Sequence, residues 1–129
     1  MPRILVVDDQ KDVRAMICMV LRVNQFDFVE AANAATALQA FGQSHFDAAI
    51  VDVFLEDSSG LELIAGLRER VPDVPVIAVS GMAIDSAERS DDLARVVYLQ
   101  KPFRPAELIH AIAAARAAVQ APPVRRAAV

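Results

Sequence analysis

The 129-residue sequence is poor in several residue types, and each shortage excludes a class of protein. A single cysteine, Cys18, excludes an internal disulfide framework and fits a reducing compartment, so we expect the cytoplasm. Aromatic residues are scarce, the formal charge is −4 and no basic stripe is present, which argues against nucleic-acid binding. No apolar run approaches the roughly 20 residues that cross a bilayer, and no signal or transit peptide is expected.

Apolar residues are abundant, at 55%, and they fall into alternating strand-like and helix-like segments. The length suits one domain with one core. Short apolar runs, typical of buried strands, occupy residues 3–7, 26–31, 47–51, 74–79 and 96–99. Helical patterns occupy residues 11–23, 33–42, 59–71 and 105–119, with a weaker one within 82–95. This alternation predicts an α/β fold, in which helices cover both faces of a parallel sheet.

Two local patterns give finer predictions. In the segment 11–23 the apolar stripe is expected to contain Met16 and Ile17, which leaves Cys18 off the stripe and inert. The final residues, 120–129, contain paired prolines and small side chains, and we expect a flexible tail after a domain spanning residues 1–119.

Polar and charged side chains stand where four of the five predicted strands end. They are Asp8 and Asp9, Asp52, Ser80, and Lys101. In an open parallel sheet, ligands bind beyond the carboxyl ends of the strands, so these groups should share one rim. Three close carboxylates would raise one another's pKa unless a cation such as Mg²⁺ neutralised them. Together with a lysine and a hydroxyl, this set favours phosphoryl transfer, in which a carboxylate can itself be the nucleophile.

The segments that carry these residues resemble a known family. The motifs VVDD, IVDV…SGLELI, VIAVSG and YLQKPF, within residues 1–118, are similar to the receiver domain of two-component response regulators. The resemblance implies a flavodoxin-like, doubly wound, five-stranded parallel sheet of order 2-1-3-4-5 with five helices. The fourth helix, within residues 82–95, would be weak or mobile. We expect a stand-alone receiver that has no output domain of its own.

The resemblance assigns roles to the residues at the rim. Asp52 would accept the phosphoryl group. Asp9, Asp52 and the backbone carbonyl of Phe54 would bind Mg²⁺ directly, while Asp8 would act largely through water. Lys101 would pair with the phosphoryl group, and its peptide bond to the following proline would be cis.

The same resemblance implies a switch. Ser80 would bond a phosphoryl oxygen and move inward on phosphorylation, and Tyr98 would follow it. This would remodel the face formed by residues 82–95, 96–99 and 105–119, where a downstream target protein would bind. The donor would be a histidine kinase or a histidine phosphotransfer protein, and the receiver would be a monomer or weak dimer with no nucleic acid or membrane as partner.

Each of these residues also has an ordinary explanation. Asp9 could cap the helix that follows it, Asp52 could begin a turn, and Lys101 could be a surface lysine. The functional interpretation is preferred because all the ordinary ones would have to coincide at one rim.

Three rival functions differ in how well the residues fit them. A phosphatase with an aspartyl-phosphate intermediate would want a second acid two residues after Asp52, where Phe54 stands. A flavodoxin-like cofactor binder would want a phosphate-binding loop after the first strand. A degenerate receiver, used only for protein interaction, stays open as the alternative. We expect no enzyme acting on other molecules, and slow self-dephosphorylation, because Phe54 and Met82 are apolar where they would flank the phosphoryl group.

Overall fold

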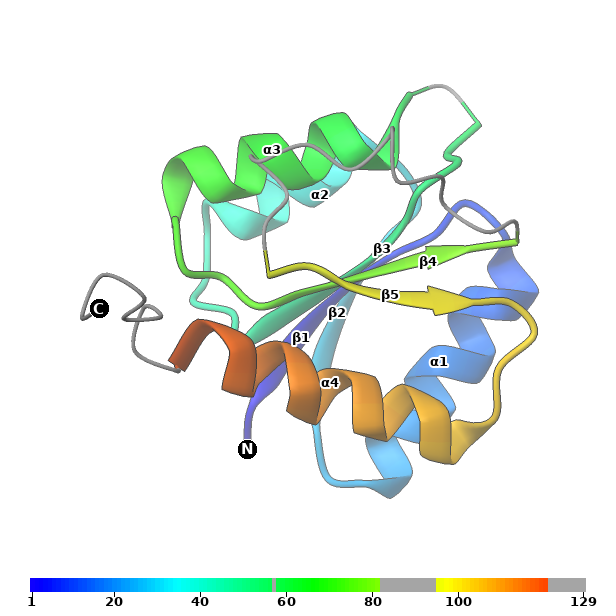
Figure 1. The fold of residues 1–129 in the computed structure, drawn as a ribbon. Helices are drawn as coiled ribbons and strands as arrows, with labels where there is room; N and C mark the ends of the chain where they lie inside the picture. Colours follow the sequence, from blue (N-terminus) through cyan, green and yellow to red (C-terminus); the bar gives the residue numbers. More distant parts are fainter. Residues whose placement is uncertain (57, 82–94, 121–129) are drawn as a thin grey trace, which may run out of the picture.

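A computed structural model of the protein describes residues 1–56, 58–81 and 95–120, which form a parallel sheet between two layers of helices (Figure 1). The strands are β1 (Arg3–Val7), β2 (Asp27–Ala31), β3 (Ala48–Asp52), β4 (Val76–Ser80) and β5 (Val97–Gln100). The helices are α1 (Lys11–Val23), α2 (Ala34–Phe41), α3 (Gly60–Arg70) and α4 (Pro105–Gln120). Each element predicted within the described ranges is confirmed. The weak helix expected within 82–95 and the expected tail lie outside the described residues, except for Arg95 and for Gln120, which ends α4.

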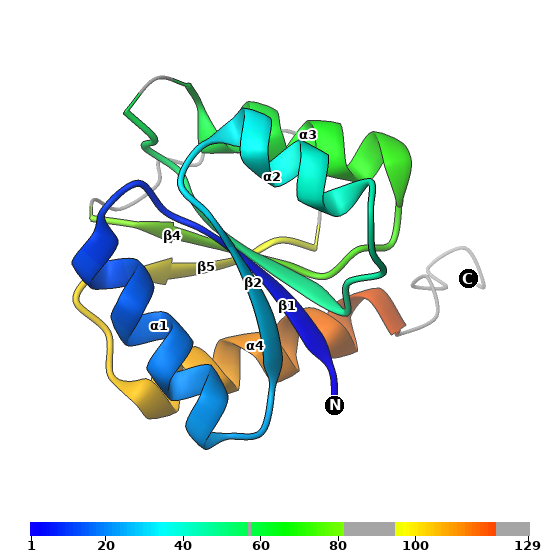
Figure 2. The same cartoon turned by 180° about the vertical axis from the view of Figure 1, so that it is seen from behind.

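The sheet has the order β2-β1-β3-β4-β5, and every neighbouring pair of strands is parallel, which confirms the flavodoxin-like prediction. Helices α2 and α3 cover one face, and α1 and α4 cover the other (Figures 1 and 2). The strand order reverses between β1 and β3, where Val7 pairs with Val51. Asp8 directly follows β1 and Asp52 is the last residue of β3, so the two acids come side by side at the topological switch point, the usual ligand site of such sheets.

The core consists of two clusters, one on each face of the sheet. Successive residues of a strand point to opposite faces, so the three central strands β1, β3 and β4 contribute side chains to both clusters in turn. This explains why their sequences are almost continuously apolar rather than alternating. Among the described residues, no helix is both long enough and apolar enough to cross a membrane.

The predicted apolar stripe of α1 is wrong at two positions. Cys18 is 5% exposed and packs into the core on the α1–α4 side, whereas Met16 is 36% exposed. Burial, followed by the charge of Glu30, raises the pKa of the Cys18 thiol to about 11. A thiol that stays protonated at neutral pH is a poor nucleophile, so the buried position still favours inertness.

Two helix starts place the chain around the site. Asn33 caps α2, since its Oδ1 accepts a hydrogen bond from the Thr36 amide at 2.8 Å. Helix α3 begins at Gly60, whose amide donates to the carbonyl of Val53 at 2.8 Å. A Cβ atom at Gly60 would lie 2.0 Å from the carbonyl oxygen of Asp52. The missing side chain therefore allows α3 to begin directly against the end of β3.

Candidate functional site

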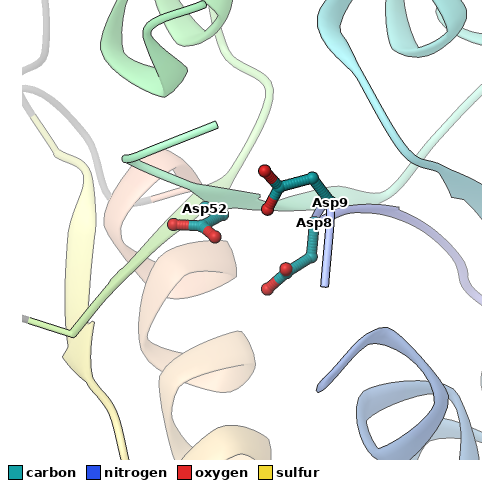
Figure 3. A group of neighbouring side chains, drawn as sticks. All are labelled: Asp8, Asp9 and Asp52. Atoms are coloured by element: carbon teal, nitrogen blue, oxygen red, sulfur yellow. The ribbon is translucent and has the colours of Figure 1, made fainter. Parts of the chain in front are cut away.

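Three carboxylates meet beyond the ends of β1 and β3. Asp8, Asp9 and Asp52 each offer an oxygen atom, and these atoms lie within 4.8 Å of one another (Figure 3). Asp8 is 1% exposed and Asp52 is 5% exposed, while Asp9 is half-buried. The rim expected from the strand ends thus gathers its three acids in one place.

The ammonium group of Lys101 lies beside two of these acids. Its Nζ is 3.3 Å from Oδ2 of Asp8 and 3.4 Å from Oδ2 of Asp52, and it donates to Oε1 of Gln10 at 3.0 Å. The Lys101 amide donates to the carbonyl of Ser80 at 2.7 Å, and the bond from Lys101 to Pro102 is cis, as expected. One ammonium group at a site with three carboxylates leaves an excess of negative charge at this rim.

The environment of Asp52 disfavours its charge. Burial is the largest effect and raises the pKa of the Asp52 carboxyl above its ordinary value. The neighbouring charge of Asp8 acts in the same direction, whereas the amide of Phe54 and the ammonium of Lys101 oppose it. An ionised carboxylate that is incompletely stabilised by its surroundings gains from a further cation.

Backbone and side-chain donors orient the acids. Oδ1 of Asp8 accepts from the Gln10 amide at 2.8 Å, and the Asp8 carbonyl accepts from Nη1 of Arg14 at 2.6 Å. Oδ1 of Asp52 accepts from the Phe54 amide at 3.0 Å. Both buried acids therefore have one carboxylate oxygen fixed by the backbone and the other directed at Lys101.

The ordinary interpretation of Asp9, as the N-cap of α1, is wrong. The N-cap is Gln10, which makes no capping bond with its side chain. Oδ2 of Asp9 instead accepts a hydrogen bond from the amide of Glu56 at 2.7 Å. Asp9 is thus held toward the loop after β3.

The donor set fits a hard divalent cation. Oδ2 of Asp8 is buried and, despite its ion pair with Lys101, accepts no hydrogen bond from the part of the chain that the structure describes. A buried carboxylate oxygen in this state is costly unless a cation or water satisfies it. Two of the three acids border a cavity of about 640 Å³, which is lined by Asp9, Gln10, Asp52, Phe54, Glu56, Gly81 and Lys101. Oxygen ligands together with room for water suit Mg²⁺, whose ligands here would be carboxylates and a loop carbonyl.

The remaining predicted residues lie close to this cavity or beside β4. The Phe54 side chain is 50% exposed and lines the cavity, whereas Met82 lies outside the described residues. Ser80 is buried at the end of β4, and Tyr98 packs, half-buried, against the core on the α2–α3 side. Because Tyr98 pairs with Ala78, two residues before Ser80, strand alternation places Ser80 and Tyr98 on the same face of the sheet.

Two residues to which the sequence interpretation gave no role belong to the site. Gln10 accepts a hydrogen bond from Lys101, and Glu56 supplies the amide that holds Asp9. The position of Gln10 directly after two aspartates was a signal for the first. The role of Glu56 depends on its backbone, so no side-chain pattern indicated it.

Comparison with known proteins places this geometry in a family. The sequence model of the response regulator receiver domain matches residues 4–113. The transcriptional regulatory protein PrrA of Mycobacterium tuberculosis is 34% identical over 109 residues, which cover 84% of this chain and 47% of PrrA. The chain spans half or less of the length of the curated relatives it matches.

Two solved structures resemble the fold closely. Response regulator TrrA of Thermotoga maritima, in complex with Mg²⁺–BeF, has a TM-score of 0.78 and is 29% identical, covering 89% of this chain and 99% of that one. A response regulator of Burkholderia pseudomallei, with a phosphorylated aspartic acid, a calcium ion and citrate, has a TM-score of 0.81. It is 28% identical and covers 93% of this chain and 71% of that one.

Proposed function

The chain belongs to the response regulator receiver domain family, and from this we propose that it is a phosphorylation-dependent switch in two-component signalling with Asp52 as the acceptor. The observation that carries the proposal is the position of the Asp52 carboxylate. It is buried at the switch point of the sheet, 3.4 Å from Nζ of Lys101 and within a group of three acids. A phosphorylated aspartic acid in the related Burkholderia protein supports it.

The proposed step joins the Asp52 carboxylate to phosphorus. A carboxylate oxygen of Asp52 attacks the phosphoryl group of a phosphohistidine, so that a P–O bond forms and the P–N bond breaks. The electron pair of the broken bond returns to the imidazole nitrogen, which takes a proton from water. The ammonium of Lys101 then pairs with a phosphoryl oxygen, because it already lies beside the attacking carboxylate.

Asp9, Asp52 and the Phe54 carbonyl would hold Mg²⁺ directly, and Asp8 would act largely through water. When bound, Mg²⁺ supplies positive charge that balances the three acids and the phosphoryl oxygens. Two observations support this assignment: the buried Oδ2 of Asp8 accepts no hydrogen bond from the described residues, and the site has more carboxylates than ammonium groups. So does the related TrrA structure, which contains Mg²⁺–BeF.

The proposed output runs through Ser80 and Tyr98, which share a face of the sheet. Movement of both side chains would alter the surface beside β5 and α4, where a target protein would bind. We place this switch in the cytoplasm, as a monomer or weak dimer. It would take its phosphoryl group from a histidine kinase or phosphotransfer protein and would act on no separate metabolite.

Phosphorylation with acetyl phosphate tests the proposal. Wild type incubated with acetyl phosphate and Mg²⁺ should gain the mass of one phosphoryl group, and the gain should vanish with EDTA. Asp52→Asn should gain none. An equal adduct on Asp52→Asn would contradict the assigned acceptor. If neither acetyl phosphate nor a panel of phosphorylated histidine kinases labels the wild type, and Mg²⁺ does not bind, the chain is a degenerate receiver that acts by protein interaction alone.

A further inference from the structure

The guanidinium of Arg14, near the start of α1, connects the loop after β1 to the end of β2. Its Nη1 donates to the backbone carbonyl of Asp8 at 2.6 Å, and its Nε donates to Oε1 of Glu30 at 3.0 Å. The Arg14 side chain is 16% exposed, so these bonds are largely shielded from water. The backbone amide of Arg14 also donates to the carbonyl of Gln10 at 2.9 Å. One residue of α1 therefore holds the loop of residues 8–10 at both of its ends.

Strand β2 supplies the other end of this connection, although the group of three acids comes from the ends of β1 and β3. Side chains alternate along a strand, and Phe28 packs on the α1–α4 face, so Glu30 faces α1 as well. The Asp8 amide donates to the carbonyl of Ala31, the last residue of β2, at 3.2 Å. The backbone of Asp8 is thus tied to β2 twice, directly through its amide and through Arg14 at its carbonyl.

We propose that Arg14 is a positioning residue, which fixes the backbone of Asp8 and so presents the carboxylates of Asp8 and Asp9 to the metal. The inference rests on the proposed function, since it takes Mg²⁺ as the ligand. A guanidinium carries five N–H donors in a rigid planar fork, so it can hold two acceptors in a fixed relation to each other. Groups that orient metal ligands without touching the metal commonly change metal affinity by about 10- to 100-fold.

The positive charge of Arg14 would act against this role. A cation beside the site disfavours a second cation, so loss of the charge alone should make Mg²⁺ bind more tightly. Loss of the anchor should make Mg²⁺ bind more weakly, because the freed loop must be ordered again when metal binds. Since Glu30 pairs with the guanidinium and offsets much of its charge, we expect the positioning effect to be the larger one. The two effects differ in sign, so one titration separates them.

Arg14→Gln tests the proposal, and Arg3→Gln is its matched control. Arg3 makes an equivalent pair where β2 begins, since its Nε lies 3.0 Å from Oδ2 of Asp27. Both substitutions change the net charge equally and remove an arginine that is bonded to a carboxylate of β2. In calorimetric titration with MgCl₂, Arg14→Gln should bind about tenfold more weakly than wild type, and Arg3→Gln should bind within about twofold of it.

Unchanged or tighter Mg²⁺ binding by Arg14→Gln would overturn the positioning role, because charge would then be its main effect. An equal loss of affinity in Arg3→Gln would overturn it too, since any disturbance of β2 would then suffice. Failure of the wild type itself to bind Mg²⁺ would instead overturn the metal site of the proposed function, and the positioning role with it.

A second measurement requires no substitution at Arg14. If Arg14 favours metal binding by holding the loop, bound metal must in turn favour the held loop. In ¹H–¹⁵N spectra of wild type, the Nε–H of Arg14 should therefore exchange more slowly with solvent once MgCl₂ is added, although arginine has no lone pair to offer a cation. The Nε–H of Arg3 should be unaffected. Equal exchange of the Arg14 Nε–H with and without bound Mg²⁺ would overturn the proposal even if Arg14→Gln failed to fold.

Discussion

Replacing Gly60 with alanine tests how closely α3 begins against the end of β3. The new Cβ would lie 2.0 Å from the Asp52 carbonyl oxygen and 2.7 Å from Cα of Val53, both of which are backbone atoms. Carbon and oxygen atoms without a bond between them approach to about 3.3 Å, so the two segments must separate by more than 1 Å. Such a shift would break the hydrogen bond from the Gly60 amide to the Val53 carbonyl and displace Asp52, the proposed acceptor.

The expected cost follows from these contacts. Inserting a methyl group into a packed site costs about 1–3 kcal/mol, and a lost hydrogen bond adds about 1 kcal/mol. We expect Gly60→Ala to lower the free energy of unfolding by about 3 kcal/mol, which corresponds to a fall in Tm of roughly 10 °C for a chain of this length. The variant should also accept phosphate poorly, because the displaced backbone carries Asp52.

The same helix provides the control. A Cβ at Gly66 would meet only Cδ2 of Leu38, at an ordinary 3.8 Å, and alanine is favoured over glycine inside a helix by about 1 kcal/mol. Gly66→Ala should therefore stabilise the protein while Gly60→Ala destabilises it. Urea unfolding followed by far-UV circular dichroism measures both, since the chain has no tryptophan. A Gly60→Ala variant as stable as Gly66→Ala would refute the close approach.

Two further predictions concern the site itself. Phe54→Asn places a polar group at the cavity wall and should speed the loss of the phosphoryl group severalfold. Intact mass, followed after the phosphoryl donor is removed, measures this loss. An unchanged rate of decay would contradict the expected shielding by Phe54. Burial raises the pKa of Asp52 in the folded state. The folded state therefore becomes less stable relative to the unfolded state as the pH rises above 3.8, the ordinary pKa of this carboxyl. Without divalent cations, Asp52→Asn should thus melt at a higher temperature than wild type at pH 7, and this difference should shrink as the pH falls to about 3.8 and below; a lower melting temperature at pH 7 would oppose this reasoning.

The elements of the fold were predictable because the strands are buried on both faces. A run such as residues 3–7 has few other uses in a soluble protein, and β1 has these bounds in the structure. Burial around α1 was harder, since Met16 and Cys18 flank Ile17 and a small rotation of the helix decides which of them meets the sheet. Side-chain type did not indicate that rotation, because both residues are compatible with either environment.

The acids of the site were predictable from strand ends, because parallel strands deliver their carboxyl ends to one rim. The contribution of Glu56 was not, since it uses a backbone amide that every residue except proline possesses. The closeness of α3 to β3 was also hidden, because a glycine before a helical pattern has several possible causes.

The separation of the core into two clusters has a consequence for how such a chain can be altered. Side chains on the α1–α4 face rarely meet those on the α2–α3 face, because the sheet lies between them. Changes in free energy at sites that share no contacts are nearly additive. The layer that packs against Tyr98 could therefore be redesigned independently of the layer that packs against Ile17. Variants of the two layers could be selected in separate libraries and then combined.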